Sequence, residues 1–266
     1  MNKLGGIKGV FSPLVVPYNN DGSINYGEYT KITKHISDNG INGILVGGST
    51  GEFANLTMEE RKNLLLAAKE GAGEHCTIIY NCTALNMNEL EQYTSWGLKQ
   101  GIDGFTATSP YYHGYDETAM FRYFGSIAEL CEGTPFYLYN IPSRTHNPIS
   151  STLVEKLIDK YANIKGIKDS SMDFMTLQEY MLVTKGRDFD VSTGNDMQIF
   201  PALKVGASGG VIALATVFPR AAAELYQYFL SGDMEKAQEI QDKFLIMCRE
   251  IRNILPIMAQ QMKQKN

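Results

Sequence analysis

The sequence predicts a (β/α)8 barrel, also called a TIM barrel, with a short C-terminal helical extension. Eight short apolar runs alternate with eight segments of helical periodicity, polar residues follow nearly every apolar run, and no stretch has the composition of a linker. Eight strand–helix units in roughly 250 residues are typical of this barrel. A doubly wound sheet is the structural alternative, because periodicity alone does not show that a sheet closes.

The predicted elements follow one another in order along the chain. The first apolar run, 9–17, ends in a turn at 19–22, and the helix expected over 26–39 ends at Gly40. Thr57 and Glu60 have the spacing of a capping box at the start of the second helix. The remaining strand–helix pairs are expected at 43–48 and 57–70, 77–82 and 87–99, 104–109 and 117–131, 135–141 and 151–161, 164–168 and 174–185, 189–193 and 197–205, and 209–214 and 221–230. A last helical stretch is expected after these pairs. The chain therefore divides into a barrel at 1–233 and a helical extension packed on it at 234–266.

Composition narrows the class of protein. A chain of 266 residues with 44% hydrophobic content can bury one large core. The formal charge of −5 is spread along the chain without a basic block, which argues against a nucleic-acid partner. The four cysteines and four histidines lie at irregular spacings, and no apolar run is long enough to span a bilayer. We therefore expect a cytoplasmic protein without a metal, a cofactor or a membrane partner.

A lysine at the end of the sixth predicted strand is the first candidate catalytic residue. Side chains on a strand alternate between its faces, so Ile164, Gly166 and Lys168 are expected to share the face that points into the barrel, next to Tyr139 of the fifth strand. Burial disfavours the ammonium form of a lysine, and the neutral amine can attack a ketone. A nearby phenol can give and take the protons that imine formation requires. The plainer alternatives are a solvated surface lysine and a tyrosine that only packs in the core.

Further polar residues are expected at the same rim of the barrel. The carboxyl ends of the strands meet on one face, where such barrels carry their active sites. The loop 47–51 offers unobstructed backbone N–H groups and two hydroxyls, which suit a carboxylate, and it lacks the pattern of a nucleotide-binding loop. The candidate residues at this rim are Gly48, Ser49, Thr50, Tyr112, Arg144, Asp196 and Ser208.

Three motifs resemble, in order and spacing, the dihydrodipicolinate synthase and N-acetylneuraminate lyase family of class I pyruvate aldolases. They are Gly48-Ser49-Thr50-Gly51-Glu52, Tyr139-Asn140-Ile141-Pro142 and Gly166-Ile167-Lys168-Asp169. The resemblance implies a Schiff base between Lys168 and pyruvate, with Tyr139 as the proton-transfer residue and Ser49 and Thr50 as carboxylate and relay hydroxyls. Tyr112 matches the family tyrosine that reaches into a neighbouring subunit's site. A homo-oligomer, either a dimer or a tetramer, is therefore expected.

The family contains several activities, and the motifs divide between them. Ser143-Arg144-Thr145 resembles the synthases, whose arginine holds the carboxylate of aspartate semialdehyde, so a 4-hydroxy-tetrahydrodipicolinate synthase-like enzyme is the first expectation. N-acetylneuraminate lyase and 2-keto-3-deoxy sugar acid aldolase are alternatives, because the loop 47–52 resembles the former and the run 168–171 the latter.

Two further alternatives belong to other functional classes. One is a noncatalytic homologue that binds a keto acid, which the intact candidate residues disfavour. The other is a metal-dependent aldolase or a phosphate-binding isomerase. It is disfavoured because no histidine and carboxylate cluster has the spacing of metal ligands.

Overall fold

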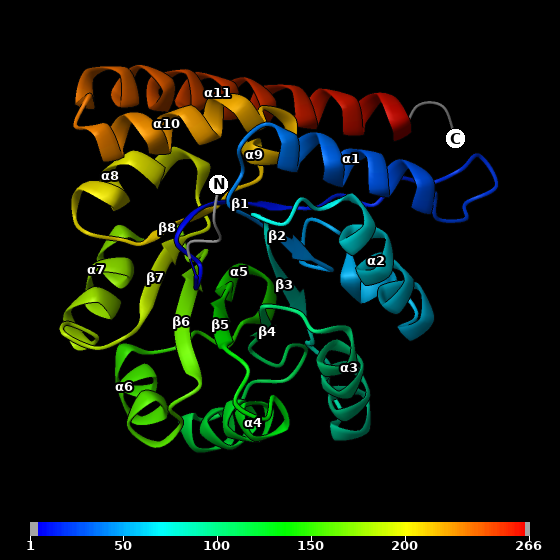
Figure 1. Ribbon diagram of the computed structural model, residues 1–266, viewed down its shortest axis with the longest axis vertical. Helices are drawn as coiled ribbons and strands as arrows, with labels where there is room; N and C mark the ends of the chain where they lie inside the picture. Colours follow the sequence, from blue (N-terminus) through cyan, green and yellow to red (C-terminus); the bar gives the residue numbers. More distant parts are fainter. Residues whose placement is uncertain (1–4, 264–266) are drawn as a thin grey trace.

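The computed structural model describes the backbone of residues 5–263 and the side chains of residues 5–251, and it confirms the predicted closed barrel. Each strand pairs in parallel with the next along the chain, and β8 returns to pair with β1. Figure 1 shows the strands at the centre with helices around them. The strands are β1 Gly9–Pro13, β2 Gly43–Val46, β3 Thr77–Asn81, β4 Gly104–Thr108, β5 Phe136–Asn140, β6 Ile164–Asp169, β7 Asp190–Thr193 and β8 Gly209–Val211.

Six of the helices that connect the strands, α1, α2, α3, α4, α6 and α7, begin at a residue whose side chain caps the first turn. Thr57 and Glu60 form the predicted capping box at the start of α2, and Ser150 caps α6 by accepting a hydrogen bond from Leu153 N. The α-helices are α1 Tyr26–Asp38, α2 Met58–Gly71, α3 Met87–Gln100, α4 Glu117–Leu130, α5 Pro142–Thr145, α6 Ser151–Lys160, α7 Phe174–Val183, α8 Ile199–Lys204, α9 Leu214–Val217, α10 Pro219–Ser231 and α11 Met234–Lys263, and two 3-10 turns, η1 Phe53–Asn55 and η2 Asp196–Gln198, lie between them. Among the helices of the described residues, 5–263, none is long and apolar enough to cross a bilayer.

Two hydrophobic layers hold the barrel together. The inner layer, which fills the barrel, consists of Ile7, Phe11, Leu45, Ile79, Tyr137 and Val211. The outer layer lies between strands and helices and includes Phe136 and Leu138. The alternation on β5 therefore directs Tyr137 inward, with Tyr139 two residues further along on the same face.

The sixth strand departs from simple alternation. Phe136 pairs with Ile164 but Tyr137 pairs with Gly166, so the strand carries a bulge. Ile164 lies in the outer layer, and the expectation that it shares the face of Lys168 is wrong. The extra residue is Lys165, whose Nζ lies 2.7 Å from the Asp188 carboxylate. The bulge turns Lys168 inward while leaving Ile164 packed against the helices.

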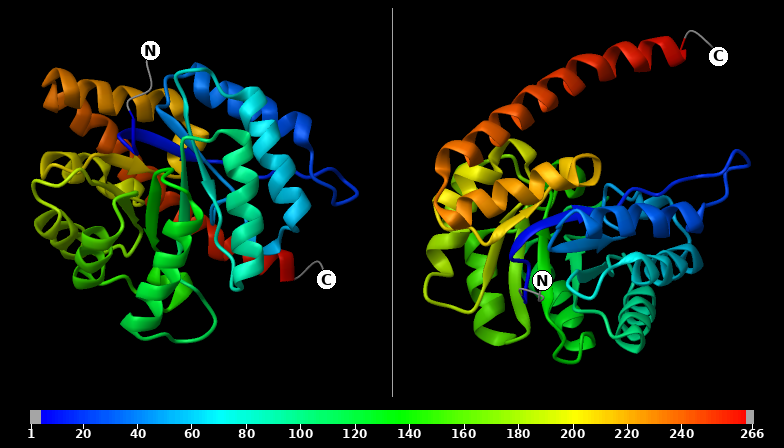
Figure 2. Two further views of the ribbon diagram at one scale, coloured as in Figure 1. Left: turned by 60° about the horizontal axis from the view of Figure 1, so that its bottom comes forward. Right: turned by 45° about the horizontal axis from the view of Figure 1, so that its top comes forward.

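The C-terminal helix α11 packs alongside α10 and against the barrel (Figure 2). Gln241 is buried, and its side chain accepts a hydrogen bond from Phe200 N at 2.8 Å and donates one to Asp196 O at 3.0 Å. These contacts attach α11 to the segment that follows β7. The last three residues of the predicted extension, 264–266, lie outside the described residues.

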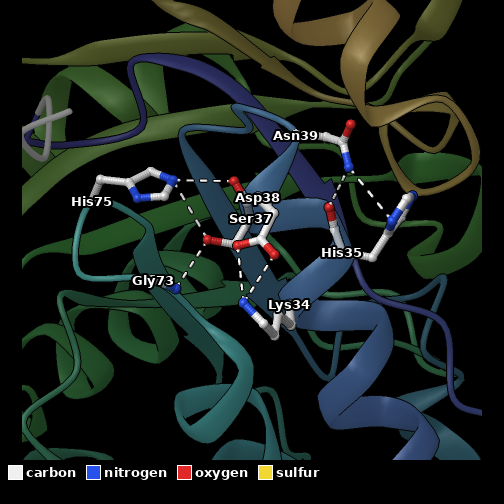
Figure 3. A network of polar contacts seen from close by, with 7 residues as sticks. All are labelled: Lys34, His35, Ser37, Asp38, Asn39, Gly73 and His75. Carbon is white, nitrogen blue, oxygen red and sulfur yellow. Dashed lines mark hydrogen bonds and ion pairs between the residues drawn. The ribbon is translucent and has the colours of Figure 1, made fainter.

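Polar contacts at the amino ends of the strands tie helices to the loops that precede strands. Ser37, near the end of α1, accepts a hydrogen bond from Gly73 N at 2.9 Å, and His75 Nε2 lies 3.2 Å from Ser37 O (Figure 3). Lys34 and Asp38 form an exposed ion pair beside them. Gly73 and His75 precede β3 in the chain, so these contacts lie at the amino ends of the strands. Residues at that end of such barrels contribute to stability, and we therefore assign these contacts a structural role.

Candidate active site

A cavity of about 640 Å³ opens at the carboxyl ends of the strands. Its walls come from the ends of β1, β4, β5, β6 and β8 and from the segments that follow β2, β4, β5, β6, β7 and β8. The candidate residues that line it are Ser49, Thr50, Tyr139, Arg144 and Lys168. Residues far apart in the sequence thus meet at the rim where the barrel places chemistry.

Lys168 lies at the inner end of the cavity and is only 6% exposed. It stands beside Tyr139 in the register of β5 and β6, and its Nζ lies 4.1 Å from the centroid of the Tyr139 ring. Gly194 leaves the space that this arrangement needs, because a Cβ there would lie 3.0 Å from Lys168 Cε and would collide with Ser170 Oγ. The amine is therefore enclosed but reaches the cavity.

Tyr139 is the most connected polar group of the site. Its hydroxyl is hydrogen-bonded to Lys168 and to the hydroxyls of Ser49 and Ser170. Burial alone raises the pKa of a phenol, but here the Lys168 charge and these three hydrogen bonds outweigh burial and lower the pKa of Tyr139. A phenol with a lowered pKa releases its proton more readily than a free tyrosine. This property suits a group that transfers protons next to an amine.

Ser49 and Thr50 face the cavity from the loop after β2. Gly47 adopts a φ of +67°, which favours glycine, and Gly51 N donates to Gly48 O at 3.0 Å to close the turn. Gly48 is buried beneath this turn and does not line the cavity. The candidate carboxylate site is therefore made by the two hydroxyls and the backbone around them.

Arg144 lies at the outer rim, on the short helix α5 that the sequence did not predict. Pro142 occupies the first helical position, where its fixed φ is compatible with a helix, and Thr145 donates from its hydroxyl to Ile141 O at 3.2 Å. Arg144 is exposed, and although its backbone N–H donates to Ile141 O at 3.0 Å, its side chain makes no hydrogen bond or ion pair with the described residues. Its guanidinium is available to a molecule in the cavity.

Three other candidates lie outside the cavity. Tyr112 is 84% exposed with a φ of 79°, and its ring packs against His113. Asp196 does not line the cavity, and its carboxylate accepts a hydrogen bond from Leu214 N at 2.6 Å. Burial raises the pKa of Asp196. It holds the start of α9 in place.

The expectation for Ser208 is wrong. Its hydroxyl donates to Asp190 at 2.9 Å, at the start of β7 and therefore at the opposite end of the barrel. The cause is the position of β8, which begins after Ser208, at Gly209. Residues before a parallel strand lie at its amino end, away from the cavity.

Ser170 is the residue that the sequence argument missed. It lines the cavity and hydrogen-bonds to Tyr139, although it stands just beyond β6. Alternation could have found it, because it is two residues after Lys168 and shares that residue's face. Tyr111 and Phe53 also line the cavity, with their ring centroids 6.2 Å apart in an edge-to-face contact. No group of three or more metal-ligating side chains occurs among the residues that the structure describes.

Comparison with known proteins gives concordant results. The sequence model of the Dihydrodipicolinate synthetase family matches residues 6–261. A 4-hydroxy-tetrahydrodipicolinate synthase of Hydrogenobaculum sp. is 31% identical over 88% of this chain and 79% of its own. The E. coli prophage protein YagE, solved in complex with pyruvate, superposes with a TM-score of 0.88 at 26% identity, over 91% of this chain and 82% of YagE. A 2-keto 3-deoxygluconate aldolase from Picrophilus torridus superposes with a TM-score of 0.85 at 28% identity, over 92% of this chain and 87% of the aldolase.

Proposed function

The chain belongs to the dihydrodipicolinate synthetase family, and on that premise we propose that it joins pyruvate to an aldehyde, or releases pyruvate from the product, through an imine on Lys168. Membership makes the chain a carbon–carbon lyase of the aldolase class. The observation that carries the proposed chemistry is the buried contact between Lys168 and Tyr139 at the inner end of the cavity.

The reaction begins when the Lys168 ammonium group gives up a proton and the neutral amine attacks the keto carbon of pyruvate. The carbinolamine that forms loses water when its oxygen receives a proton, and the product is an imine. Tyr139 supplies this proton, and Ser49 and Ser170 remain its hydrogen-bonding partners. The Tyr139 phenolate can then accept the proton that is released in the next step. Loss of a proton from the methyl carbon to the Tyr139 phenolate gives an enamine, and when this carbon attacks the aldehyde, the aldehyde oxygen takes up a proton.

Pyruvate is held by its carboxylate at Ser49 and Thr50. Two hydroxyls and the backbone N–H groups of a glycine-rich turn provide several donors to one anion. The similarity to YagE, whose structure was solved with pyruvate, supports this choice of keto acid. The carboxylate then lies beside Tyr139, so the keto carbon falls within reach of Lys168.

The aldehyde partner carries a carboxylate, and aspartate semialdehyde is the leading candidate. Arg144 is a guanidinium at the rim without a partner among the described residues, and a carboxylate is the group that it binds best. The activity test is incubation with pyruvate and a panel of aldehydes while pyruvate consumption is measured. Aspartate semialdehyde should be consumed fastest, and a preference for neutral aldehydes would contradict the assignment.

Arg144→Ala should raise the KM for the acidic aldehyde by about 10-fold to 100-fold and leave the KM for pyruvate nearly unchanged. Loss of a charge-assisted hydrogen bond costs roughly 1.5–3 kcal/mol. Steady-state kinetics with each substrate varied in turn measures the split. Arg187→Ala, which removes an arginine paired with Asp159 on the surface, is the matched control. Equal handling of acidic and neutral aldehydes by Arg144→Ala and the parent would exclude this role.

A sugar-acid aldolase is the second candidate. Ser143, Asn55 and Ser170 line the cavity and would suit the hydroxyls of a sugar-derived aldehyde. The similarity to the Picrophilus aldolase also favours it. Retention of activity on hydroxylated aldehydes after Arg144→Ala would distinguish this candidate from the first.

We also propose that the protein is a cytoplasmic homo-oligomer in which Tyr112 enters the active site of a neighbouring subunit. Tyr112 is exposed beside the cavity-lining Tyr111, which is the arrangement that such an exchange would require. Analytical ultracentrifugation would give the oligomeric state, and a monomer with full activity would exclude this role for Tyr112.

A further inference from the structure

We infer that Asn81 is a positioning residue that fixes the loop carrying Ser49 and Thr50, and this inference rests on the proposed role of that loop in binding pyruvate. Asn81 is the last residue of β3 and is completely buried. Its side-chain amide donates a hydrogen bond to Gly47 O at 2.6 Å. It does not line the cavity, so any effect on the reaction passes through the loop.

The amide of Asn81 continues the sheet where backbone pairing stops. Val46 pairs with Tyr80 at the end of β2, so Gly47 and Asn81 are the next residues on each strand. At this point the chain after β2 leaves the strand, with a positive φ at Gly47. The Asn81 side chain gives the carbonyl at the root of the loop a buried donor and so holds it in place.

Neighbouring groups fix the orientation of this amide. The Asn81 side-chain oxygen accepts hydrogen bonds from the Thr83 hydroxyl at 2.6 Å and from Thr83 N at 3.2 Å. A rotated amide would place its oxygen against Gly47 O and its NH₂ against the Thr83 N–H. The Thr83 hydroxyl in turn accepts from Thr108 N at 2.9 Å, which links the ends of β3 and β4.

A buried arginine holds the backbone of the same segment. Arg61 of α2 is 3% exposed, and its guanidinium donates to Asn81 O at 2.6 Å and to Thr83 O at 3.0 Å. The guanidinium carbon lies 3.7 Å from the centroid of the Tyr93 ring. No ion pair of Arg61 occurs within the described part of the chain. Two carbonyls and an aromatic face therefore stabilise this cation, and Asn81 cannot shift without disturbing it.

The position of Gly47 determines where the catalytic hydroxyls lie. Gly47 is two residues before Ser49, and it leads directly into the turn 48–51, which carries Ser49 and Thr50 and is closed by the bond from Gly51 N to Gly48 O. A displaced Gly47 carbonyl would therefore move Ser49 away from Tyr139 and Thr50 away from the substrate carboxylate. Small displacements of positioned groups weaken binding and catalysis strongly.

Asn81→Asp tests the inference because it keeps the shape of the side chain and replaces the donor with a carboxylate oxygen that repels Gly47 O. The readout is the pyruvate concentration that gives half-maximal trapping by borohydride on Lys168. This concentration should rise about tenfold, the effect of losing roughly 1.4 kcal/mol. The KM for the aldehyde should stay the same, because Arg144 lies on a separate element.

The matched control is Asn163→Asp. Asn163 also donates its amide to a backbone carbonyl, Ala128 O at 2.7 Å, but it precedes β6 at the other end of the barrel. It should lose thermal stability without changing the pyruvate dependence. A purely structural role of Asn81 would give the same result for Asn81→Asp, and that outcome would overturn the inference.

Thr83→Val provides a second variant, which removes the hydroxyl that donates to the Asn81 side chain and accepts from Thr108 N. It should raise the half-maximal pyruvate concentration about threefold, and an unchanged value would contradict the inference even if Asn81→Asp fails to fold. Absence of trapping in the parent protein would instead refute the proposed function. The two failures are therefore distinguishable.

Discussion

Lys168→Ala should lose all turnover of pyruvate with any aldehyde, down to the background rate without protein. The substitution removes the amine that forms the imine, and no other lysine among the described residues lines the 640 Å³ cavity. The initial rate of pyruvate consumption at saturating substrate is the measurement. Lys168→Arg should be equally inactive, since a guanidinium stays protonated and cannot form the imine.

The matched control for this prediction is Lys165→Ala. Lys165 belongs to the same strand, but its Nζ pairs with Asp188 on the outside of the barrel. The variant should retain nearly full activity, because an exposed ion pair contributes little to stability. Loss of activity in Lys165→Ala together with retention in Lys168→Ala would reverse the assignment.

Tyr139→Phe should slow turnover by about 100-fold or more while leaving the binding of pyruvate nearly intact. The ring keeps its packing, but the hydroxyl that connects Lys168, Ser49 and Ser170 is lost. The lowered pKa of Tyr139 gives a further expectation. The neutral phenol donates the proton, so the rate should fall as the pH rises through this pKa, and the variant should lack this decrease.

Tyr137→Phe is the control for Tyr139→Phe. It makes the same chemical change on the same face of β5, two residues deeper, where the hydroxyl lies towards the amino end of the barrel. Its turnover should stay within about threefold of the parent. An unchanged rate in Tyr139→Phe would mean that another group, such as Ser49 or Tyr112, moves the proton.

Periodicity predicted the fold well because it records burial. Strands of a parallel barrel are covered on both sides and form continuous apolar runs, while the helices keep one apolar face. The limits of β8 were harder to predict, because the apolar run continues past Val211 and nothing in the sequence marks where the strand ends. The predicted strand 209–214 therefore ran into α9, and Ser208 was placed at the wrong end. The bulge at Lys165 depends on pairing with β5 and has no local signal.

The candidate site was predictable to the extent that its residues lie at the carboxyl ends of strands or in the segments that follow them. Lys168, Tyr139, Ser49, Thr50 and Arg144 meet in one cavity for this reason. The contact of Asn81 with Gly47 could not be predicted, because it joins two strand ends through one side-chain amide and no spacing encodes it. The direction of Asp196 was equally hidden, since it depends on a bond to Leu214 N in a later element.

The imine on Lys168 is the central claim, and mass spectrometry after borohydride reduction tests it most directly. The protein is incubated with pyruvate, reduced, digested, and its peptides are sequenced. A reduced pyruvyl adduct should be found on the peptide that contains Lys168, with fragment ions that distinguish Lys168 from Lys165, and Lys168→Ala should carry none. An adduct on Lys165 or on another lysine, or its persistence in Lys168→Ala, would contradict the account.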